Sequence, residues 1–294
     1  MMNKKTFANN VLNAIKVKLG DYYKVTLNPV TKNNGLNLLG LLIQKHNNAI
    51  CPNIYLDDYY KQSLRGRSFE DIVEDILETY ANSMMNTNLS LDWLQDKESF
   101  LSKVAYKLVN RDLNENLLES VPYIPIVGDL VKVFYLTVTM GEESGTILIH
   151  NGLMENAGVT LEELDTSANI NTPALYPFEF ETMENVLSGF LSNNESKGNP
   201  LGMYVLSNVQ KVFGASTLCY KGLLDKICEK LKSSIYIIPS SIHELIILSS
   251  EHCESVPFLN ALIRETNTTH VSQDELLSNH LYYYNKDIHS LSVA

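Results

Sequence analysis

Apolar residues recur at helical spacing in two segments near the start of the chain. Residues 6–19 carry apolar side chains three or four positions apart and end at Gly20, a pattern typical of an amphipathic helix. The same spacing over residues 69–85 predicts a longer helix, for which Ser68 is the expected N-cap. Acidic residues in the first turn of that segment suit the positive end of the helix dipole. Both segments therefore predict helices that pack one face onto a core.

The stretch between these helices alternates apolar and polar residues instead. Residues 22–44 form two such runs around Asn33-Asn34-Gly35, and a turn of this composition predicts a β-hairpin. Two further helices are expected at 97–109 and 113–120. Residues 1–120 thus predict a helix-rich region that carries one hairpin.

The pattern changes from residue 121 onward, where strands become frequent. Alternation over residues 131–137 and a returning run at 146–150 predict a second hairpin. The remaining expected elements are helices at 151–157, 160–168, 180–191, 221–232 and 256–267, and strands at 203–208, 215–220, 234–239, 243–249 and 280–285. Because short links join the paired strands, antiparallel pairing is favoured over parallel crossovers. We predict an α+β fold, with a mainly antiparallel sheet flanked by helices over residues 121–294.

Composition and charge narrow the class of protein. The chain has 294 residues, 45% of them hydrophobic, which is enough for one large domain or two smaller ones with a full core. Its formal net charge is −11, from 23 Lys and Arg against 34 Asp and Glu. Such an acidic chain is not expected to bind nucleic acid directly, since phosphates require a basic face. The charge instead suits simple solubility or a basic protein partner.

The cysteines and the lack of targeting signals favour a cytoplasmic protein. Cys51, Cys219, Cys228 and Cys253 include no C-x-x-C pair, so buried free thiols are expected and neither a zinc site nor a redox motif is predicted. The N-terminus lacks the apolar core of a signal peptide, and no run approaches the roughly 18 apolar residues of a transmembrane helix. The nucleotide-binding patterns G-x-x-x-x-G-K-[ST] and G-x-G-x-x-G are absent from the sequence. No cofactor and no membrane association are therefore expected.

Several phrases, most of them in the second half of the chain, point to a family. They are GDLVKVFYLTV, ILIHNGLMENAGVTLEELDTSANINTP, MYVLSNVQKVFGASTLCYKGLLDKICEKL, YIIPSSIHELIIL and ALIRETNTTHVSQDELLSNHLYYYN. The chain resembles an uncharacterised bacterial family, domain of unknown function 5688, which is common in gut Firmicutes and is often found in mobile elements. The resemblance covers most of the chain and is strongest over residues 120–285. It implies a bacterial cytoplasmic protein in an accessory-gene context, and it transfers no activity and no catalytic residue.

The segment IYIIPSSIHELIILSS, residues 235–250, contains the weak catalytic candidates His243 and Glu244. A zinc protease of the H-E-x-x-H type needs a second histidine four positions after the first, and Ile247 stands there. The serine hydrolase motif G-x-S-x-G is absent as well. Pro239 and the two serines after it instead predict a turn between two strands. His243 and Glu244 remain the residues on which an unrecognised hydrolase would be centred, and no metal site is predicted.

Tyrosines and an acidic pair supply the candidate binding residues. The chain has 16 tyrosines, and Tyr282 and Tyr284 are expected on the same face of one strand. Tyrosine gives a large contact area at low entropic cost and is enriched at interfaces, although packing of a sheet against helices explains it equally well. The acidic pair is expected in a solvated hairpin turn. The candidate binding residues are Tyr282, Tyr284, Tyr59, Tyr60, Glu142 and Glu143.

These features favour a non-catalytic protein that binds a basic protein partner, as an accessory or anti-defence factor of a mobile element. Two alternatives stay open. One is a hydrolase of unrecognised type with His243 and Glu244 at its centre. The other is a regulator that binds a small ligand between the helical region and the sheet. The sequence leaves the oligomeric state open.

Overall fold

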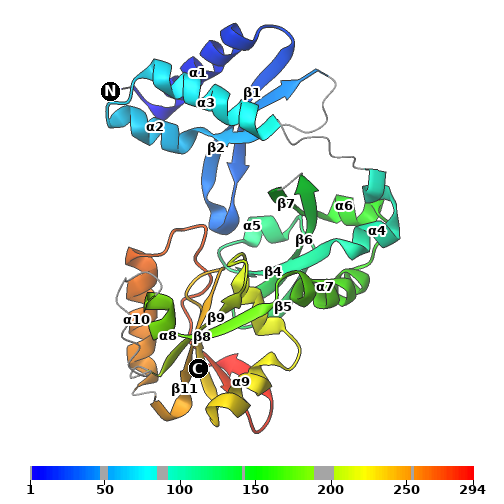
Figure 1. Ribbon diagram of the computed structural model, residues 1–294, viewed down its shortest axis with the longest axis vertical. Coiled ribbons are helices and arrows are strands. Elements are labelled where there is room, and N and C mark those ends of the chain that lie inside the picture. Colours follow the sequence, from blue (N-terminus) through cyan, green and yellow to red (C-terminus); the bar gives the residue numbers. More distant parts are fainter. Residues whose placement is uncertain (1, 47–51, 85–91, 141–142, 189–201, 253–254) are drawn as a thin grey trace. The chain divides into compact units, whose positions relative to one another are not determined.

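The computed structural model describes residues 2–46, 52–84, 92–140, 143–188, 202–252 and 255–294. Its contacts divide the chain into two compact units (Figure 1). The N-terminal unit comprises residues 1–91 with 139–145, and the C-terminal unit comprises residues 92–138 with 146–294. By its contacts the segment 92–120 belongs to the C-terminal unit. The boundary expected at residue 120 stays a prediction about which parts fold independently.

The N-terminal unit is a three-stranded antiparallel sheet with helices packed on one face. Its elements are α1 (Lys4–Leu19), β1 (Tyr23–Thr31), β2 (Asn37–Lys45), β3 (Asn53–Tyr55), α2 (Leu56–Leu64) and α3 (Phe69–Met84). The strand order is β1-β2-β3. Val25, Leu41 and Ile43 point from the sheet into a core that they share with Phe7 of α1 and Ile72 of α3. Alternate residues of these strands therefore form the opposite face of the sheet.

The predicted elements of this unit are confirmed. α1 and α3 match the expected helices, and β1 and β2 form the expected hairpin. The Asp71 N–H donates to Ser68 Oγ at 3.1 Å, so Ser68 caps α3. In the hairpin turn, Asn34 and Gly35 take φ values of 56° and 69°. Asparagine and glycine tolerate this left-handed region better than other residues.

The first sheet of the C-terminal unit is built around the long strand β6. Its elements are α4 (Lys97–Ser102), β4 (Val104–Asn110), α5 (Glu115–Leu118), β5 (Tyr123–Val127), β6 (Leu130–Met140), β7 (Glu143–Leu148), α6 (Asn151–Asn156) and α7 (Leu161–Leu175). β6 pairs antiparallel with β4 and with β5, and β7 pairs with β6 as well. α7 packs on β4, where the Tyr106 N–H donates to Thr172 Oγ1 at 3.1 Å.

The second sheet of this unit has six antiparallel strands in the order β13-β12-β10-β11-β9-β8. Its elements are β8 (Phe178–Thr182), α8 (Met183–Ser188), β9 (Met203–Asn208), α9 (Leu223–Leu231), β10 (Ile235–Ile238), β11 (Leu245–Ser249), α10 (Val256–Thr269), β12 (Tyr282–Asn285) and β13 (Ser290–Val293). On one face, Ile227 of α9 lies in the same core as Ile237. On the other, Ile263 of α10 packs with Leu248. The sheet is therefore covered by helices on both faces.

The α+β class with antiparallel sheets is confirmed, while three local predictions are wrong. The helix expected at 97–109 ends at Ser102, because the buried residues 104–110 pair with β6 as strand β4. The helix expected at 180–191 begins as strand β8 and becomes helical only at Met183.

Within the described residues, no helix has the length and apolar character to cross a membrane.

The strand expected at 215–220 is a 3₁₀ helix, Gly214–Cys219. A Cβ atom on Gly214 would lie 2.2 Å from His243 O and 2.1 Å from Ser207 Oγ. Glycine therefore lets this segment press against the end of β9 and the turn before β11. Ala215 and Leu218, the apolar residues expected on a strand, are buried from this helical turn instead.

Candidate functional site

An exposed apolar patch lies where α7 ends and the second sheet begins. Leu175, Phe178, Val209 and Val212 expose 42%, 47%, 59% and 38% of their surface. We call these four residues the edge patch. Single exposed apolar side chains are ordinary, whereas a contiguous group of them marks a contact surface.

Hydrogen bonds hold the two halves of the edge patch side by side. The Val209 N–H donates to Pro177 O at 3.0 Å. Gln210 Nε2 donates to Leu175 O, also at 3.0 Å. The loop after β9 is thus tied to the link between α7 and β8, so the exposed apolar residues of both segments are neighbours in the fold.

A side-chain clamp stiffens the loop after β9. Asn208 Nδ2 donates to Val212 O at 2.7 Å, and the Val212 N–H donates back to Asn208 Oδ1 at 3.2 Å. Asn208 is only 1% exposed, so these bonds are largely shielded from water and hold the loop firmly. The edge patch is therefore presented on a fixed backbone.

The strand beside the edge patch is an acidic sheet edge. Among the described strands, β8 pairs with β9 alone. Glu179 and Glu181 lie on β8, where Glu179 makes an ion pair with Lys211 and Glu181 is exposed. An open edge of this kind can accept a further strand from another chain. Backbone hydrogen-bonding groups, apolar side chains and negative charge are therefore available in one place.

The edge patch is not among the binding residues predicted from the sequence. Its signal is present in the phrase LYPF at 175–178 and in Val209 and Val212, which are apolar residues in segments with turn-like composition. Their exposure depends on β8 lying at the edge of the sheet. Strand order is set by long-range pairing, which the spacing of residues does not show.

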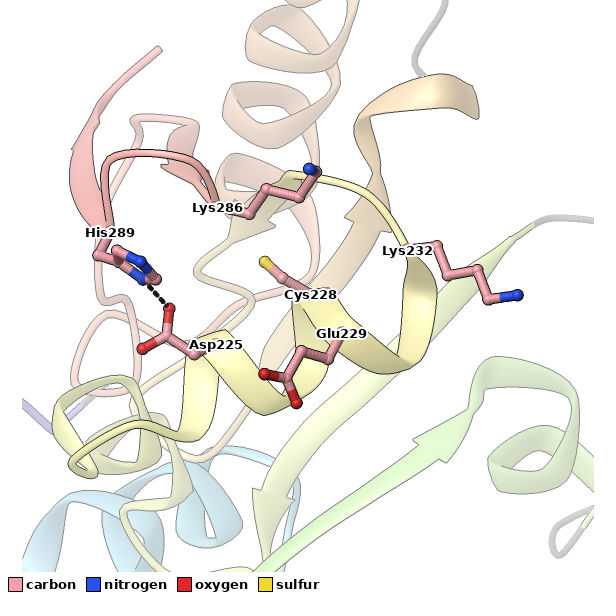
Figure 2. Close-up of a pocket in the computed structure, with 6 residues that line it drawn as sticks. All are labelled: Asp225, Cys228, Glu229, Lys232, Lys286 and His289. Atoms are coloured by element: carbon pink, nitrogen blue, oxygen red, sulfur yellow. Dashed lines mark hydrogen bonds and ion pairs between the residues drawn. The ribbon is translucent and has the colours of Figure 1, made fainter.

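A separate pocket lies beside helix α9 (Figure 2). Its volume is about 380 Å³. The side chains that line it come from α9 and from the segment between β12 and β13, and they are Asp225, Cys228, Glu229, Lys232, Lys286 and His289.

The polar centre of this pocket is the pair Asp225 and His289. His289 Nδ1 lies 2.7 Å from Asp225 Oδ1, and the Tyr284 hydroxyl donates to the same oxygen at 2.6 Å. These two hydrogen bonds, from Tyr284 first and His289 second, hold the pKa of Asp225 below its usual range. The His289 side chain is 69% exposed, and a contact so open to water adds little to stability.

The chemical capacity of the pocket is limited. Burial raises the pKa of the Cys228 thiol to about 11, so this group is protonated and weakly nucleophilic at neutral pH. The ammonium groups of Lys232 and Lys286 point away from the Asp225–His289 pair (Figure 2). Within the part of the chain that the structure describes, no three His, Cys, Asp or Glu residues are grouped to hold a metal ion. The described side chains of the pocket assemble neither an activated nucleophile nor a metal site.

His243 and Glu244 lie in the predicted turn between β10 and β11. His243 Nδ1 accepts the Phe213 N–H at 3.2 Å, and the two rings stack with their centroids 5.9 Å apart. Glu244 Oε1 accepts a hydrogen bond from Ser240 Oγ at 3.3 Å. The antiparallel pairing of β10 with β11 confirms the hairpin. Both candidate catalytic side chains are therefore engaged in contacts that shape the turn.

Tyr282 and Tyr284 share one face of β12, as expected, and that face is the core. Tyr282 has no exposed area and Tyr284 is 7% exposed. The Tyr282 hydroxyl donates to Asp129, a buried carboxylate that also accepts from Ser278 Oγ at 2.9 Å and from Asn110 Nδ2 at 2.6 Å. This cluster ties β12 to the segment between β5 and β6 of the first sheet, so Tyr282 helps to hold the C-terminal unit together.

The other predicted binding residues are dispersed. Tyr59 and Tyr60 are half-buried on α2 of the N-terminal unit, and the Tyr59 hydroxyl donates to Asp75 Oδ1 at 3.3 Å. Glu142 lies outside the described residues. Glu143 begins β7, and its side chain lies outside the described part. The candidate tyrosines thus belong to two different units.

Comparison with known proteins identifies a family. A family model described as "Family of unknown function (DUF5688)" matches residues 4–286. No curated protein and no solved structure matches the chain significantly. The matched range includes both the N-terminal helices and the C-terminal unit up to strand β12. The chain therefore belongs to the family of unknown function DUF5688.

Proposed function

We propose that the chain is a protein-binding module whose C-terminal unit takes up an extended, basic segment of a partner at the β8 edge. The observation that supports this proposal is the edge patch, four side chains exposed by 38% to 59% beside an acidic edge strand. Strand addition supplies main-chain hydrogen bonds, and the side chains beside the edge select the partner sequence.

Charge supports a basic partner. Residues 92–294 contain 26 Asp and Glu against 13 Lys and Arg, and β8 carries Glu179 and Glu181. Opposite charges speed the encounter of two proteins and reject competitors of the wrong charge. Because side chains alternate along a strand, the partner segment should alternate apolar residues with Lys or Arg.

The proposed setting is the bacterial cytoplasm. There the partner is a basic, nucleic-acid-handling protein of the host, and the chain acts as an accessory factor of a mobile element. The support for this setting is the family resemblance together with the net charge of −11.

The test compares two surface variants with the wild-type chain. Phe178→Ser with Val209→Ser removes the centre of the edge patch, and Phe258→Ser removes an equally apolar side chain, 60% exposed, from α10 of the same unit. All three tagged proteins are incubated with host lysate, and the retained proteins are quantified by mass spectrometry at low and moderate salt. Exposed substitutions of this kind shift stability by only about 0.5 kcal/mol, so all three remain folded.

The proposal requires one basic protein that wild type and Phe258→Ser retain in stoichiometric amount and that the double variant loses. Its retention should weaken with salt, because the contact is partly electrostatic. Equal retention by the double variant, or an acidic partner, would contradict the proposal. We assign no catalytic role to His243 and Glu244, since both side chains are occupied within the turn.

A further inference from the structure

The sheet of the N-terminal unit has one face that the helices of this unit do not cover. Val25, Leu41 and Ile43 face the core beneath α1 and α3. The residues that alternate with them face the other way. We call this side the open face. It comprises the even-numbered residues of β1 (24–30) and of β2 (38–44), together with Asn53 and Tyr55 of β3.

The open face lies in a part of the chain without acidic residues. From Tyr22 to Leu56 the sequence contains no Asp and no Glu, whereas it contains Lys24, Lys32 and Lys45. Among the described residues, none of these lysines makes an ion pair with a carboxylate. Their positive charge is therefore available to a ligand.

The net charge of −11 conceals an uneven distribution. Residues 1–91 hold ten of the 23 Lys and Arg but only eight of the 34 Asp and Glu. The acidic excess thus lies entirely in residues 92–294. The expectation that this chain does not bind nucleic acid rests on the whole-chain average, and it does not apply to a local basic face.

Both ends of the open face carry features that suit a polyanion. At one end, Lys32 Nζ lies 4.5 Å from the centre of the Tyr55 ring. At the other end, a pocket of about 280 Å³ is lined by Lys24, Gln44, Lys45 and His46. Lys24 and Lys32 are eight residues apart on one extended segment, which is roughly 26 Å at about 3.3 Å per residue.

The centre of the open face carries polar groups beside Leu38 and Leu42. A Cβ atom on Gly40 would lie 1.8 Å from Asn53 Oδ1, so the Asn53 side chain extends across β2 at the position where any other residue would block it. A glycine within a strand often marks such a close approach. Thr26 and Asn28 add further hydrogen-bonding groups on the same side.

We infer that the open face binds single-stranded nucleic acid. Lys24 and Lys32 on this side, together with Lys45 in the pocket beside Lys24, contact phosphates. The Tyr55 ring stacks on an unpaired base, as aromatic residues do on sheet surfaces that bind single strands. A duplex is disfavoured because its bases are already paired and stacked, so none is free to stack on the Tyr55 ring. This activity belongs to the N-terminal unit and is independent of the β8 edge.

The test is fluorescence anisotropy of the full chain with labelled oligomers of roughly twelve nucleotides, a length within the site sizes of single-strand-binding folds. The probes are oligouridylate, oligothymidylate and a duplex of equal length, with polyglutamate as a competitor. Three phosphate contacts predict a slope of about −2 in log affinity against log salt. The variants are Lys24→Glu with Lys32→Glu, Tyr55→Ala, Tyr55→Phe, and, as a control, Lys5→Glu, which makes the same charge reversal at one exposed lysine of α1.

Binding of either single strand, with weaker binding of the duplex, supports the inference. The lysine double variant should lose about tenfold or more in affinity, while Lys5→Glu should change it less than about twofold. Tyr55→Ala should lose roughly five- to 150-fold, and Tyr55→Phe should bind as wild type does. No binding at low salt, stronger binding of the duplex, equal competition by polyglutamate, or equal losses in Lys5→Glu and the double variant would overturn it. Thermal unfolding of each variant confirms that it is folded.

Discussion

The buried hydroxyl of Tyr282 offers a quantitative test of how the C-terminal unit is held together. Tyr282 is fully buried, and burial, followed by the hydrogen bond to Asp129, raises the pKa of its hydroxyl well above its usual range. The group is therefore a protonated donor at neutral pH, and it donates to the Asp129 carboxylate. Tyr282→Phe removes this donor and keeps the ring.

The expected cost of Tyr282→Phe follows from the partners that remain. A hydrogen bond to a charged group contributes about 1.5–3 kcal/mol. Asp129 keeps Ser278 Oγ at 2.9 Å and Asn110 Nδ2 at 2.6 Å, so its charge is not left without donors. The loss should therefore fall in the lower half of that range, at about 2 kcal/mol.

Urea unfolding measures this loss, with Trp93 as the probe. Trp93 is the only tryptophan of the chain, and it lies in the C-terminal unit, so its fluorescence reports that unit. Tyr283→Phe is the matched control, because Tyr283 lies on the same strand and packs against Tyr236, with the two ring centres 5.1 Å apart. The control should lose less than about 0.5 kcal/mol. Equal effects of the two substitutions, or no effect of Tyr282→Phe, would refute the assignment of Asp129 as a stabilising acceptor.

Three further results are expected. Thr160→Ala should destabilise the C-terminal unit by about 1 kcal/mol in the same assay, because it removes the capping box formed with Glu163 at the start of α7; an unchanged midpoint would contradict this. Asp225→Asn should lower stability at neutral pH. Its difference from wild type should begin to shrink as pH falls below about 4 and should be lost at lower pH, because a depressed carboxyl pKa stabilises fully above the unfolded value and progressively less as pH falls through the folded value; a difference that stays constant down to low pH would argue against the Tyr284 and His289 contacts. Cys219 and Cys228 are free thiols, and burial raises the pKa of each to about 11. At pH 8 iodoacetamide should therefore modify both thiols of the folded protein roughly a hundredfold more slowly than those of the protein unfolded in urea, as measured by peptide mass spectrometry. Comparable rates in the two states would contradict their burial.

Local signals in the sequence were sufficient for the elements that depend on neighbouring residues. The helix capped by Ser68 and the hairpin around Asn34-Gly35 are specified by side chains within a few positions, and both are present. The segment 104–110 was mistaken for helix because it continues the apolar spacing of α4. Its pairing with β6, from Asn110 opposite Leu130 to Val104 opposite Leu136, decides the strand.

The candidate site was less accessible to sequence reasoning for the same physical reason. Tyr282 and Tyr284 were correctly placed on one face of a strand, but only the fold shows that this face meets a buried carboxylate. Conversely, Phe178 and Val209 are exposed because β8 lies at the end of the strand order. The net charge of the whole chain likewise averages over residues 1–91, which have a small excess of basic residues, and residues 92–294, which are acidic. Burial, edge position and local charge are properties of the assembled fold.

Site-specific photocrosslinking tests the proposed binding edge most directly. A photoreactive phenylalanine analogue is placed at Phe178, and in a second protein at Phe258, an apolar position of similar exposure outside the edge patch. Each protein is irradiated in host lysate, and the crosslinked peptides are identified by mass spectrometry. Binding at the β8 edge predicts one partner crosslinked from position 178, through an extended segment rich in Lys or Arg, with little product from position 258. Equal products from both positions, or an acidic or helical partner segment at position 178, would contradict it.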